Sequence, residues 1–331
     1  MVLLITSSTC QDLLMLNLPK ITDLDVTNKK VLVRLDLDIK KFNEEDLRLK
    51  ASVKTLDYLK DKASEIIIIA HRGRPEGKNV PELSLKEFQP YFDKWGAKVE
   101  ENLRFDEGEE KNDSEFAKKL ASLGEVFIND AFASSHRNHA SIVGLPKLMS
   151  SCFGFHFLEE IENLGREFEK PVTVVISGIK EDKVEMAKKL SNIYDKVLVG
   201  GRLPEYFGDE SLESVRNQKS NLIIGNLVQD KEDITLNTIE KFKDELKTAG
   251  TVILAGALGK YEDEGHSQGT KEIFEYISKL TAFKIAGGGD TETCLQNYNL
   301  TDKFNWVSVG GGACLEFLTN KTLPAIEAMS N

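Results

Sequence analysis

The segment "NDAFASSHRNHASIVG", residues 129–144, carries two of the chain's five histidines. His136 and His139 are three residues apart, and Arg137 lies between them. Two imidazoles at this spacing could bind a metal, act as general bases or contribute to a site for an anion. The metal interpretation is weak, because no third ligand stands at a suitable spacing nearby. A structural role, with one histidine capping backbone and the other packing, stays open beside anion contact.

Further cations and polar groups follow the apolar runs of the first half. "KKVLVRLDLDI" (29–39) ends with a group of charged residues, and "SEIIIIA" (64–70) runs into the loop "HRGRPEGKN". A single loop arginine is usually a solvated surface group. Several cations at successive carboxyl ends of one parallel sheet would instead converge on one small polyanion. The residues concerned are Arg34, Asp36, Asp38, Arg48, His71, Arg72, Arg74, Arg104 and Arg137.

Glycines take the corresponding place in the second half. "AGGGDTETCLQ" (286–296) and "SVGGGACLEFL" (308–318) each follow a strand-like run with three glycines and a helical stretch. Such junctions expose backbone N–H groups to phosphate, and Asp290 could hold a Mg²⁺ that bridges the phosphates. Together with Lys180 and Lys183 in "ISGIKEDK" they predict a nucleotide site. Neither run fits the GxxxxGK[ST] loop or the GxGxxG fingerprint.

The elements that must position these groups alternate between apolar runs and amphipathic stretches, which predicts parallel sheets covered on both faces. Two helices of the first half are expected at 44–63 and 113–124, the second capped by Asp113. The fold class is therefore α/β, with two doubly wound parallel-sheet domains and ligands at the carboxyl ends of the strands. Strands are expected at 29–39, 64–70, 124–130, 171–179, 195–201, 221–226, 250–259, 283–290 and 304–312.

Composition narrows the class of protein. The 331 residues are 40% hydrophobic and carry a net charge of −11, which allows two cores and argues against a general binder of nucleic acid or membranes. Residues 1–17 lack the basic start of a signal peptide, so we expect an N-terminal extension. The cysteines form no CxxC pair, which indicates reduced thiols in a cytosol; they are Cys10, Cys152, Cys294 and Cys314.

Taken together, these segments resemble the phosphoglycerate kinase family. "KKVLVRLDLDI" resembles the family's VLVRVDFNVP, and "AHRGRPEGK" resembles SHLGRPKG. The block "ENLRFDEGEEKNDSEFAKKLASLGEVFINDAFASSHRNHASIVGLP" (101–146) matches the family almost word for word. "AGGGDT" and "VSVGGGACLEFLTNKTLPAIEAM" match its C-terminal signature. The resemblance extends from about Leu18 to the end of the chain.

The resemblance implies a domain plan and a reaction. The plan is an N-terminal extension (1–17), a substrate domain (18–154), an interdomain helix (155–170), a nucleotide-binding domain (171–311) and a C-terminal segment (312–331) returning to the first domain. The reaction is reversible phosphoryl transfer between 1,3-bisphosphoglycerate and ADP, giving 3-phosphoglycerate and ATP with Mg²⁺. The enzyme would be a hinge-bending, glycolytic phosphotransferase acting on a carboxyl group, a cytoplasmic monomer whose partners are small molecules.

The resemblance also assigns residues. It makes "SSHRNH" part of an anion pocket with Arg137 as its main contact, and it matches Arg48 to the arginine that stabilises the transferring phosphoryl group. The catalytic positions are Arg48, Lys180, Gly288 and Gly311. The acid substrate would be bound by Asp36, Asp38, Arg48, His71, Arg74, Arg104 and Arg137. The nucleotide would be bound by Lys180, Lys183, Gly200, Gly201, Glu262, Gly287, Gly288, Gly289, Asp290 and Thr291, with Asp290 also a metal ligand.

The chain departs from the family mainly on the nucleotide side. GGAKVSDK becomes "SGIKEDK", one residue short, which moves Lys183 one position along its helix and turns it by about 100°. NGPMG becomes "AGALG", so Ala255 replaces an asparagine that touches nucleotide. The part between Gly208 and Thr251 is shorter and lacks the loop over the adenine. On the acid side, Asp38 replaces an asparagine and adds a negative charge.

These departures leave an alternative open. A catalytically weak or inactive paralogue could bind a phosphorylated acid as a sensor or scaffold. The retained Arg48, Glu262 and the Gly-Gly-Gly-Asp-Thr run favour the kinase.

Overall fold

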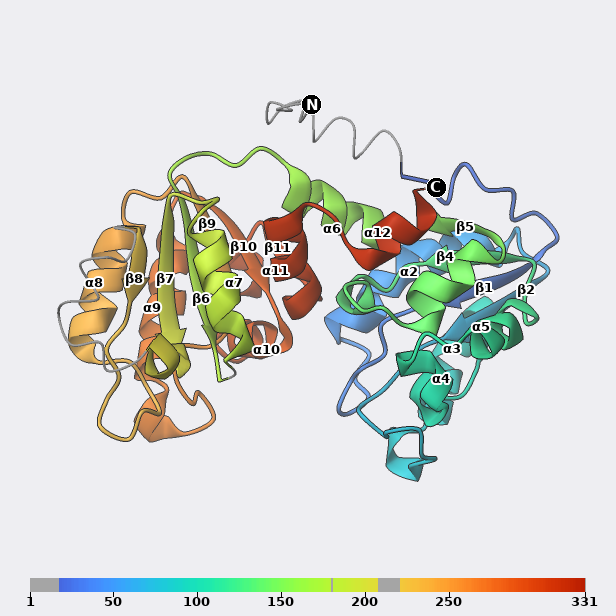
Figure 1. Ribbon diagram of the computed structural model, residues 1–331, viewed down its shortest axis with the longest axis horizontal. Coiled ribbons are helices and arrows are strands. Elements are labelled where there is room, and N and C mark those ends of the chain that lie inside the picture. Colours follow the sequence, from blue (N-terminus) through green and yellow to red (C-terminus); the bar gives the residue numbers. More distant parts are fainter. Residues whose placement is uncertain (1–17, 180, 208–220, 331) are drawn as a thin grey trace. The chain divides into compact units, whose positions relative to one another are not determined.

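The computed structural model describes residues 18–179, 181–207 and 221–330, and the chain divides into two compact α/β units (Figure 1). Unit 1 extends to Arg166 and resumes at Asn320, and unit 2 spans Glu167–Thr319. The predicted N-terminal extension 1–17 and Lys180 lie outside the described residues. No helix in the described part of the chain is both long and apolar enough to span a bilayer.

Unit 1 is built on a parallel sheet in the order β3-β2-β1-β4-β5. The first strand of the chain is central, and later strands are added on one side and then on the other, which is the doubly wound plan. The strands are β1 (Lys30–Arg34), β2 (Glu65–Ile69), β3 (Ala97–Val99), β4 (Val126–Asn129) and β5 (Ser150–Phe153). The helices are α2 (Leu47–Lys60), α3 (Gln89–Phe92), α4 (Glu107–Glu110), α5 (Ser114–Ala121), α6 (Phe155–Gly165) and α12 (Pro324–Met329).

Alternate residues of β1 and β2 enter two different cores. Val31 and Val33 pack on one face with Leu56 of α2, while Leu32 packs on the other face with Phe116 of α5. Because successive strand side chains point to opposite faces, a strand covered on both sides must be apolar at every position. This is the physical reason for the continuous apolar runs in the sequence.

Unit 2 repeats the plan with a parallel sheet in the order β11-β10-β9-β6-β7-β8. Its core includes Val175, Leu198 and Leu254 from the strands, packed with Phe242 of α8 and Phe274 of α9. The strands are β6 (Val172–Gly178), β7 (Lys196–Gly201), β8 (Leu222–Ile224), β9 (Thr251–Ala255), β10 (Phe283–Gly287) and β11 (Trp306–Ser308). The helices are α7 (Asp182–Leu190), α8 (Leu236–Leu246), α9 (Gln268–Lys279), α10 (Gly289–Asn297) and α11 (Gly311–Asn320).

The structure differs from the predicted plan at two boundaries. Helix α6 ends at Gly165 instead of continuing to residue 170, because Arg166 turns into extended backbone at φ −61° and ψ 161°. Residues 312–319 stay with unit 2, since α11 packs there and the Leu318 carbonyl accepts a hydrogen bond from Tyr194. The return to unit 1 begins at Asn320, and α12 is fixed there when Ala325 N–H donates to the Ser135 carbonyl.

Local signals predicted some elements better than others. The Asp113 side chain caps α5 by accepting from the Phe116 N–H, as its position in the sequence suggested. The edge strands β3 and β5 were not predicted. Each is only three or four residues long, and β5 begins with Ser150 and Ser151, so neither shows a run of β-branched residues.

Candidate functional site

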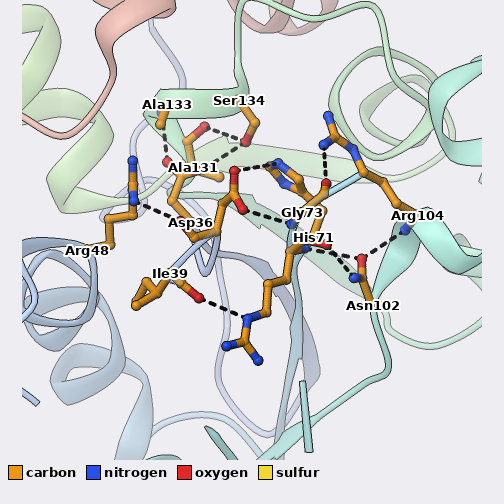
Figure 2. Close-up of polar contacts among 12 residues, drawn as sticks. Asp36, Ile39, Arg48, His71, Gly73, Asn102, Arg104, Ala131, Ala133 and Ser134 are labelled. Atoms are coloured by element: carbon orange, nitrogen blue, oxygen red, sulfur yellow. Dashed lines mark hydrogen bonds and ion pairs between the residues drawn. The ribbon is translucent and has the colours of Figure 1, made fainter. Parts of the chain in front are cut away.

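The functional end of unit 1 lies where the winding of the sheet reverses, between β1 and β4. The loops that follow these strands are joined by Asp36, which is buried. Its carboxylate accepts from the Ala133 N–H at 2.7 Å and from the Ser134 hydroxyl at 2.8 Å (Figure 2). Asp36 therefore fixes the segment that carries Arg137, and both its oxygens are already used within the protein.

A second set of contacts connects Arg48 to Arg104. Arg48 Nη1 donates to the Asp38 carbonyl at 2.8 Å, and Asp38 Oδ1 accepts from the Gly73 N–H at 2.8 Å. The Gly73 carbonyl in turn accepts from Arg104 Nη1 at 2.6 Å. In Figure 2, Arg48, Gly73 and Arg104 lie around Asp36 and His71. The predicted acid-binding residues of three separate loops and of helix α2 are thus brought together by hydrogen bonds.

Three arginines of this region keep buried N–H groups without an acceptor among the described residues. They are Arg48 at Nε, Arg104 at Nε and Nη2, and Arg137 at Nε. Arg104 Nε does lie 3.2 Å from Glu110 Oε1, but the N–H does not point along that line, so we count it as an ion pair only. Burying a charged donor without a partner is costly. The cluster is therefore complementary to an anion.

The histidines of the region are neutral at neutral pH. Burial, followed by the charge of Arg137, lowers the pKa of His136 to about 4. Burial, followed by the charges of Arg104 and Arg34, lowers the pKa of His139 to about 3. These observations favour structural and positioning roles, and no group of three or more possible metal ligands occurs in the described ranges.

Two neighbouring arginines have different roles. Arg72 is buried, and its guanidinium donates to the carbonyls of Ile39 and Lys40 and pairs with Glu87 at 2.8 Å. It holds the loop after β1 in place. Arg74 is exposed, and no hydrogen bond or ion pair holds it to another described residue. It is free to meet a ligand, but the structure does not pre-position it.

Sequence reasoning overlooked the small polar residues that hold this cluster. The Ser134 hydroxyl donates to Asp36. The Asn102 side-chain oxygen accepts from the backbone N–H groups of Arg72 and Arg104 and so connects the loops after β2 and β3. Ser141 binds both Arg34 and Glu109. The available signal was the number of serines and asparagines beside the charged residues in the 101–146 block.

Unit 2 reverses its winding between β6 and β9. The contacts at this end of the sheet are made mainly by backbone groups. Gly256 has φ +114°, a conformation that favours glycine, and its N–H donates to the Thr291 hydroxyl at 2.8 Å. That hydroxyl also donates to the Gly287 carbonyl, and Thr291 is fully buried. Thr291 was predicted to bind nucleotide, but its hydroxyl is committed to shaping the loop that would receive it.

The two glycine-rich junctions touch each other. Gly288 precedes α10 with φ +108°, and Gly311 begins α11. A side chain at Gly311 would place its Cβ only 2.8 Å from the Gly288 Cα, so only glycine allows this approach. Gly287 ends β10 and Gly289 begins α10. The arrangement exposes the starts of two helices side by side, which suits phosphate binding.

The glycines at the end of β7 serve packing inside the unit. A Cβ at Gly200 would lie 2.2 Å from a methyl of Leu258, and a Cβ at Gly201 would lie 2.4 Å from the Ser177 hydroxyl. Their lack of side chains is thus explained without a ligand. Lys183 folds back over Gly178, and its ammonium donates to the Ser177 carbonyl at 2.7 Å, which places one cation at the end of β6.

Two of the predicted nucleotide-binding residues of unit 2 carry carboxylates. Asp290, in the first turn of α10, and Glu262 are both exposed. Burial raises the pKa of Tyr261, and the charges of Asp290 and Glu262 raise it further, so all three side chains are neighbours. Asp290 offers a single carboxylate, and Mg²⁺ commonly binds one or two carboxylates together with phosphates and water. The exposed carboxylate fits a nucleotide-bound Mg²⁺ and not an all-protein metal site.

Comparison with known proteins covers nearly the whole chain. The family model described as "Phosphoglycerate kinase" matches residues 21–100, 98–222 and 212–321. A phosphoglycerate kinase of Coprothermobacter proteolyticus is 33% identical over 386 residues, covering 94% of this chain and 98% of that protein. One of Dictyoglomus turgidum is 31% identical and covers 93% and 97%. The first alignment is longer than this chain, so that relative carries segments without a counterpart here.

Comparison with solved structures leads to the same family as comparison of sequences. The structure of phosphoglycerate kinase from Coxiella burnetii superposes with a TM-score of 0.76 at 29% identity, covering 94% of this chain and 98% of that one. A phosphoglycerate kinase from Pyrococcus horikoshii shares the fold with a TM-score of 0.78 at 24% identity and the same coverage. The family model, the relatives and the shared two-sheet fold leave one conclusion: this chain belongs to the phosphoglycerate kinase family.

Proposed function

We propose that this chain transfers a phosphoryl group reversibly between 1,3-bisphosphoglycerate and ADP, giving 3-phosphoglycerate and ATP, with a substrate carboxyl group as acceptor in the reverse direction. Family membership supports the kinase activity. The observation that carries the assignment of unit 1 to the acid is its set of buried N–H groups without acceptors on Arg48, Arg104 and Arg137. A small phosphorylated acid supplies the missing acceptors and neutralises the cluster.

In this proposal the acid is oriented by groups that are already fixed. Arg104 and Arg48 are held by backbone carbonyls on one side and keep donors free for phosphate or carboxylate on the other. Arg137 contributes from the segment anchored by Asp36, and Arg74 is added from solvent. His71 provides a neutral donor. Preorganised donors need not be rearranged when the ligand binds, which lowers the cost of binding.

The nucleotide would bind at the carboxyl end of the unit 2 sheet. Its phosphates would meet the N–H groups at the starts of α10 and α11, and Lys183 would approach them from α7. Glu262 would contact the ribose, as the family resemblance implies, and Asp290 would hold Mg²⁺, which neutralises charge on the phosphates when bound. Lys180 is proposed from the resemblance alone, since it lies outside the described residues.

Little acid–base chemistry is required, because an acyl phosphate is already activated. Catalysis would come from positioning, charge neutralisation and exclusion of water. Arg48 and the backbone N–H groups near Gly288 and Gly311 would stabilise charge on the transferring phosphoryl group. The acid and the nucleotide bind to different units in this proposal, so a hinge motion must bring them together. We further propose that the enzyme works as a cytoplasmic monomer in glycolysis.

A coupled assay with 3-phosphoglycerate, ATP and Mg²⁺ tests the function. We expect turnover that requires all three components and stops when EDTA removes the metal. The control is the same assay with the Arg48→Ala variant. Binding of 3-phosphoglycerate without any turnover would instead support the paralogue hypothesis, which no feature of the described residues favours.

A further inference from the structure

Four buried side chains form a continuous line from the interior of unit 1 to the acid site. They are Glu109 of α4, Ser141, Arg34 at the end of β1 and His71 after β2; the first three have no exposed surface and His71 is 4% exposed. Ser141 Oγ lies 2.6 Å from Glu109 Oε1 and 3.1 Å from Arg34 Nε. Arg34 Nη2 lies 2.9 Å from His71 Nδ1. We call these four residues the Glu109–His71 line.

The direction of each hydrogen bond in the line is fixed by chemistry. An arginine side chain has only N–H donors, so the Ser141 oxygen and His71 Nδ1 must both accept from Arg34. A carboxylate only accepts, and Glu109 accepts from the Ser141 hydroxyl and from the Ser141 backbone N–H at 3.0 Å. The serine proton is therefore turned toward Glu109, which leaves its lone pair for Arg34.

The same constraint decides where His71 carries its proton. With Nδ1 accepting, a neutral imidazole must hold its proton on Nε2. Burial, followed by the charges of Arg34, Arg104 and Arg137, lowers the pKa of His71 well below its usual value, so the ring is neutral. Its Nε2 lies 3.9 Å from Oδ2 of Asp38, whose side chain is half exposed. The other tautomer would present a lone pair to an arriving anion and would repel it.

We propose that Glu109, Ser141 and Arg34 are positioning residues that hold His71 as its Nε2–H tautomer, so that His71 meets the anionic acid as a neutral hydrogen-bond donor. Glu109 also offsets the charge of Arg34 in the interior. The substrate part of this inference rests on the proposed function, whereas the tautomer does not.

The first test is ¹⁵N NMR of the histidines in the full chain without ligand, with His71 assigned by comparison with His71→Gln. We expect a neutral Nε2–H imidazole at pH 7, since burial and the neighbouring arginines lower the pKa of His71 well below its usual value of about 6.5. A neutral Nδ1–H ring or an imidazolium would overturn the proposal. This measurement needs no variant of the positioning residues and no substrate.

The second test breaks the line at Ser141. In Ser141→Ala, Arg34 loses its link to Glu109, and we expect both His71 tautomers together with about tenfold weaker binding of 3-phosphoglycerate by calorimetry, the equivalent of one hydrogen bond to a charged ligand. Ser141→Thr keeps the hydroxyl and should restore both readouts. Ser52→Ala removes another buried serine hydroxyl of unit 1, which donates to the Leu49 carbonyl, and should change neither.

A single Nε2–H tautomer with parent-like affinity in Ser141→Ala would overturn the positioning role. If that variant does not fold, Ser141→Cys provides a weaker acceptor in the same place, and an intermediate mixture of tautomers supports the proposal. If the parent chain shows the Nε2–H tautomer but does not bind 3-phosphoglycerate, the tautomer assignment stands and the proposed substrate is wrong. The two failures are thus distinguishable.

Discussion

The two units share one winding plan, yet they build their functional ends from different materials. Unit 1 gathers charged side chains at its switch point and fixes them through Asp36, Asp38 and Gly73. Unit 2 brings backbone together at the carboxyl ends of its strands, with Gly288 against Gly311 and Gly256 held by Thr291. The comparison teaches that a parallel sheet only determines where a ligand binds. Whether the site consists of charged side chains or of backbone N–H groups depends on the residues that follow the strands.

This difference predicts different sensitivities to substitution. Removing a charged group in unit 1 should impair binding or turnover while the unit stays folded. Adding a single methyl group at a contact glycine of unit 2 should distort the loop itself. Each of the chain's two tryptophans lies in a different unit, Trp95 in unit 1 and Trp306 in unit 2. Variants with one tryptophan replaced by phenylalanine therefore report the unfolding of one unit at a time.

The largest effect is expected for Arg48→Ala. If Arg48 stabilises the transferring phosphoryl group, its contribution appears mainly in the transition state, and kcat should fall by about 10³–10⁵ while the binding of 3-phosphoglycerate weakens far less. Turnover in the coupled assay and calorimetry with 3-phosphoglycerate separate the two quantities. Lys50→Ala on the same helix removes an exposed cation paired with Glu45 and should be nearly silent. A parallel loss of affinity would make Arg48 a binding group only.

Next in size is Arg104→Ala, which removes a buried cation with N–H groups free for the acid. Charge-assisted hydrogen bonds are worth about 1.5–3 kcal/mol each, so the affinity for 3-phosphoglycerate should fall at least about tenfold. Calorimetry without nucleotide measures this. Lys98→Ala removes an exposed positive charge from the same unit, where it pairs with Glu100, and should leave the affinity unchanged. Equal losses in both variants would point to a general effect of net charge.

Gly311→Ala tests the backbone contact in unit 2. The added Cβ would approach the Gly288 Cα to 2.8 Å, and we expect a loss of about 1–3 kcal/mol in the stability of unit 2, together with weaker nucleotide binding. Urea denaturation followed by Trp306 fluorescence measures the stability. Gly265→Ala is the control in the same unit, because a Cβ at Gly265 would come no closer than 3.4 Å to another side chain. If unit 2 of Gly311→Ala unfolds at the same urea concentration as that of the parent chain, the close approach of Gly311 to Gly288 does not contribute to its stability.

Acid should destabilise unit 1 through its neutral histidines. The unfolded chain protonates His139 near pH 6.5, but the folded chain does so only at about pH 3. Because the unfolded state binds the proton first, stability falls as the pH drops below about 6.5. The slope is at most about 1.4 kcal/mol per pH unit for this group, and solvent screening reduces it.

We expect His139→Gln to lose less stability than the parent chain between pH 7 and pH 5, as measured by urea denaturation followed by Trp95 fluorescence. Comparison with the parent chain is essential, because the raised pKa of His156 gives a contribution of opposite sign, present at low pH and lost as the pH rises. Identical pH profiles for the two proteins would contradict the prediction.

The smallest effect is expected for Asp38→Asn. The amide oxygen of an asparagine can still accept from the Gly73 N–H, whereas the negative charge beside His71 is lost. Since the charge is partly exposed and screened, we expect 3-phosphoglycerate to bind about three- to tenfold more tightly, roughly 1 kcal/mol. Asp38→Ala removes the charge and the hydrogen bond together and should gain less. Weaker binding in Asp38→Asn would show that the carboxylate itself orients the site.

The sequence by itself determined the architecture and the location of both sites. Strands buried on two faces must be apolar throughout, and the carboxyl ends of parallel strands meet at one edge, so the order of residues alone places Asp36, His71 and the glycine runs at such edges. Helix α5 could also be delimited at its start, because its cap depends only on neighbours in the chain. Signals of this kind are local or follow from topology.

Only the tertiary structure decided what each side chain does. The sequence does not distinguish the roles of Arg72 and Arg104. In the structure, Arg72 donates to the carbonyls of a distant loop, whereas Arg104 keeps buried N–H donors without an acceptor. The hydroxyl of Thr291 is engaged by Gly287 of its own segment and by Gly256 of a distant loop. The tautomer of His71 depends on Arg34, 37 residues away in sequence. The direction of a hydrogen bond is set by partners that only packing brings within reach, and no sequence pattern encodes it.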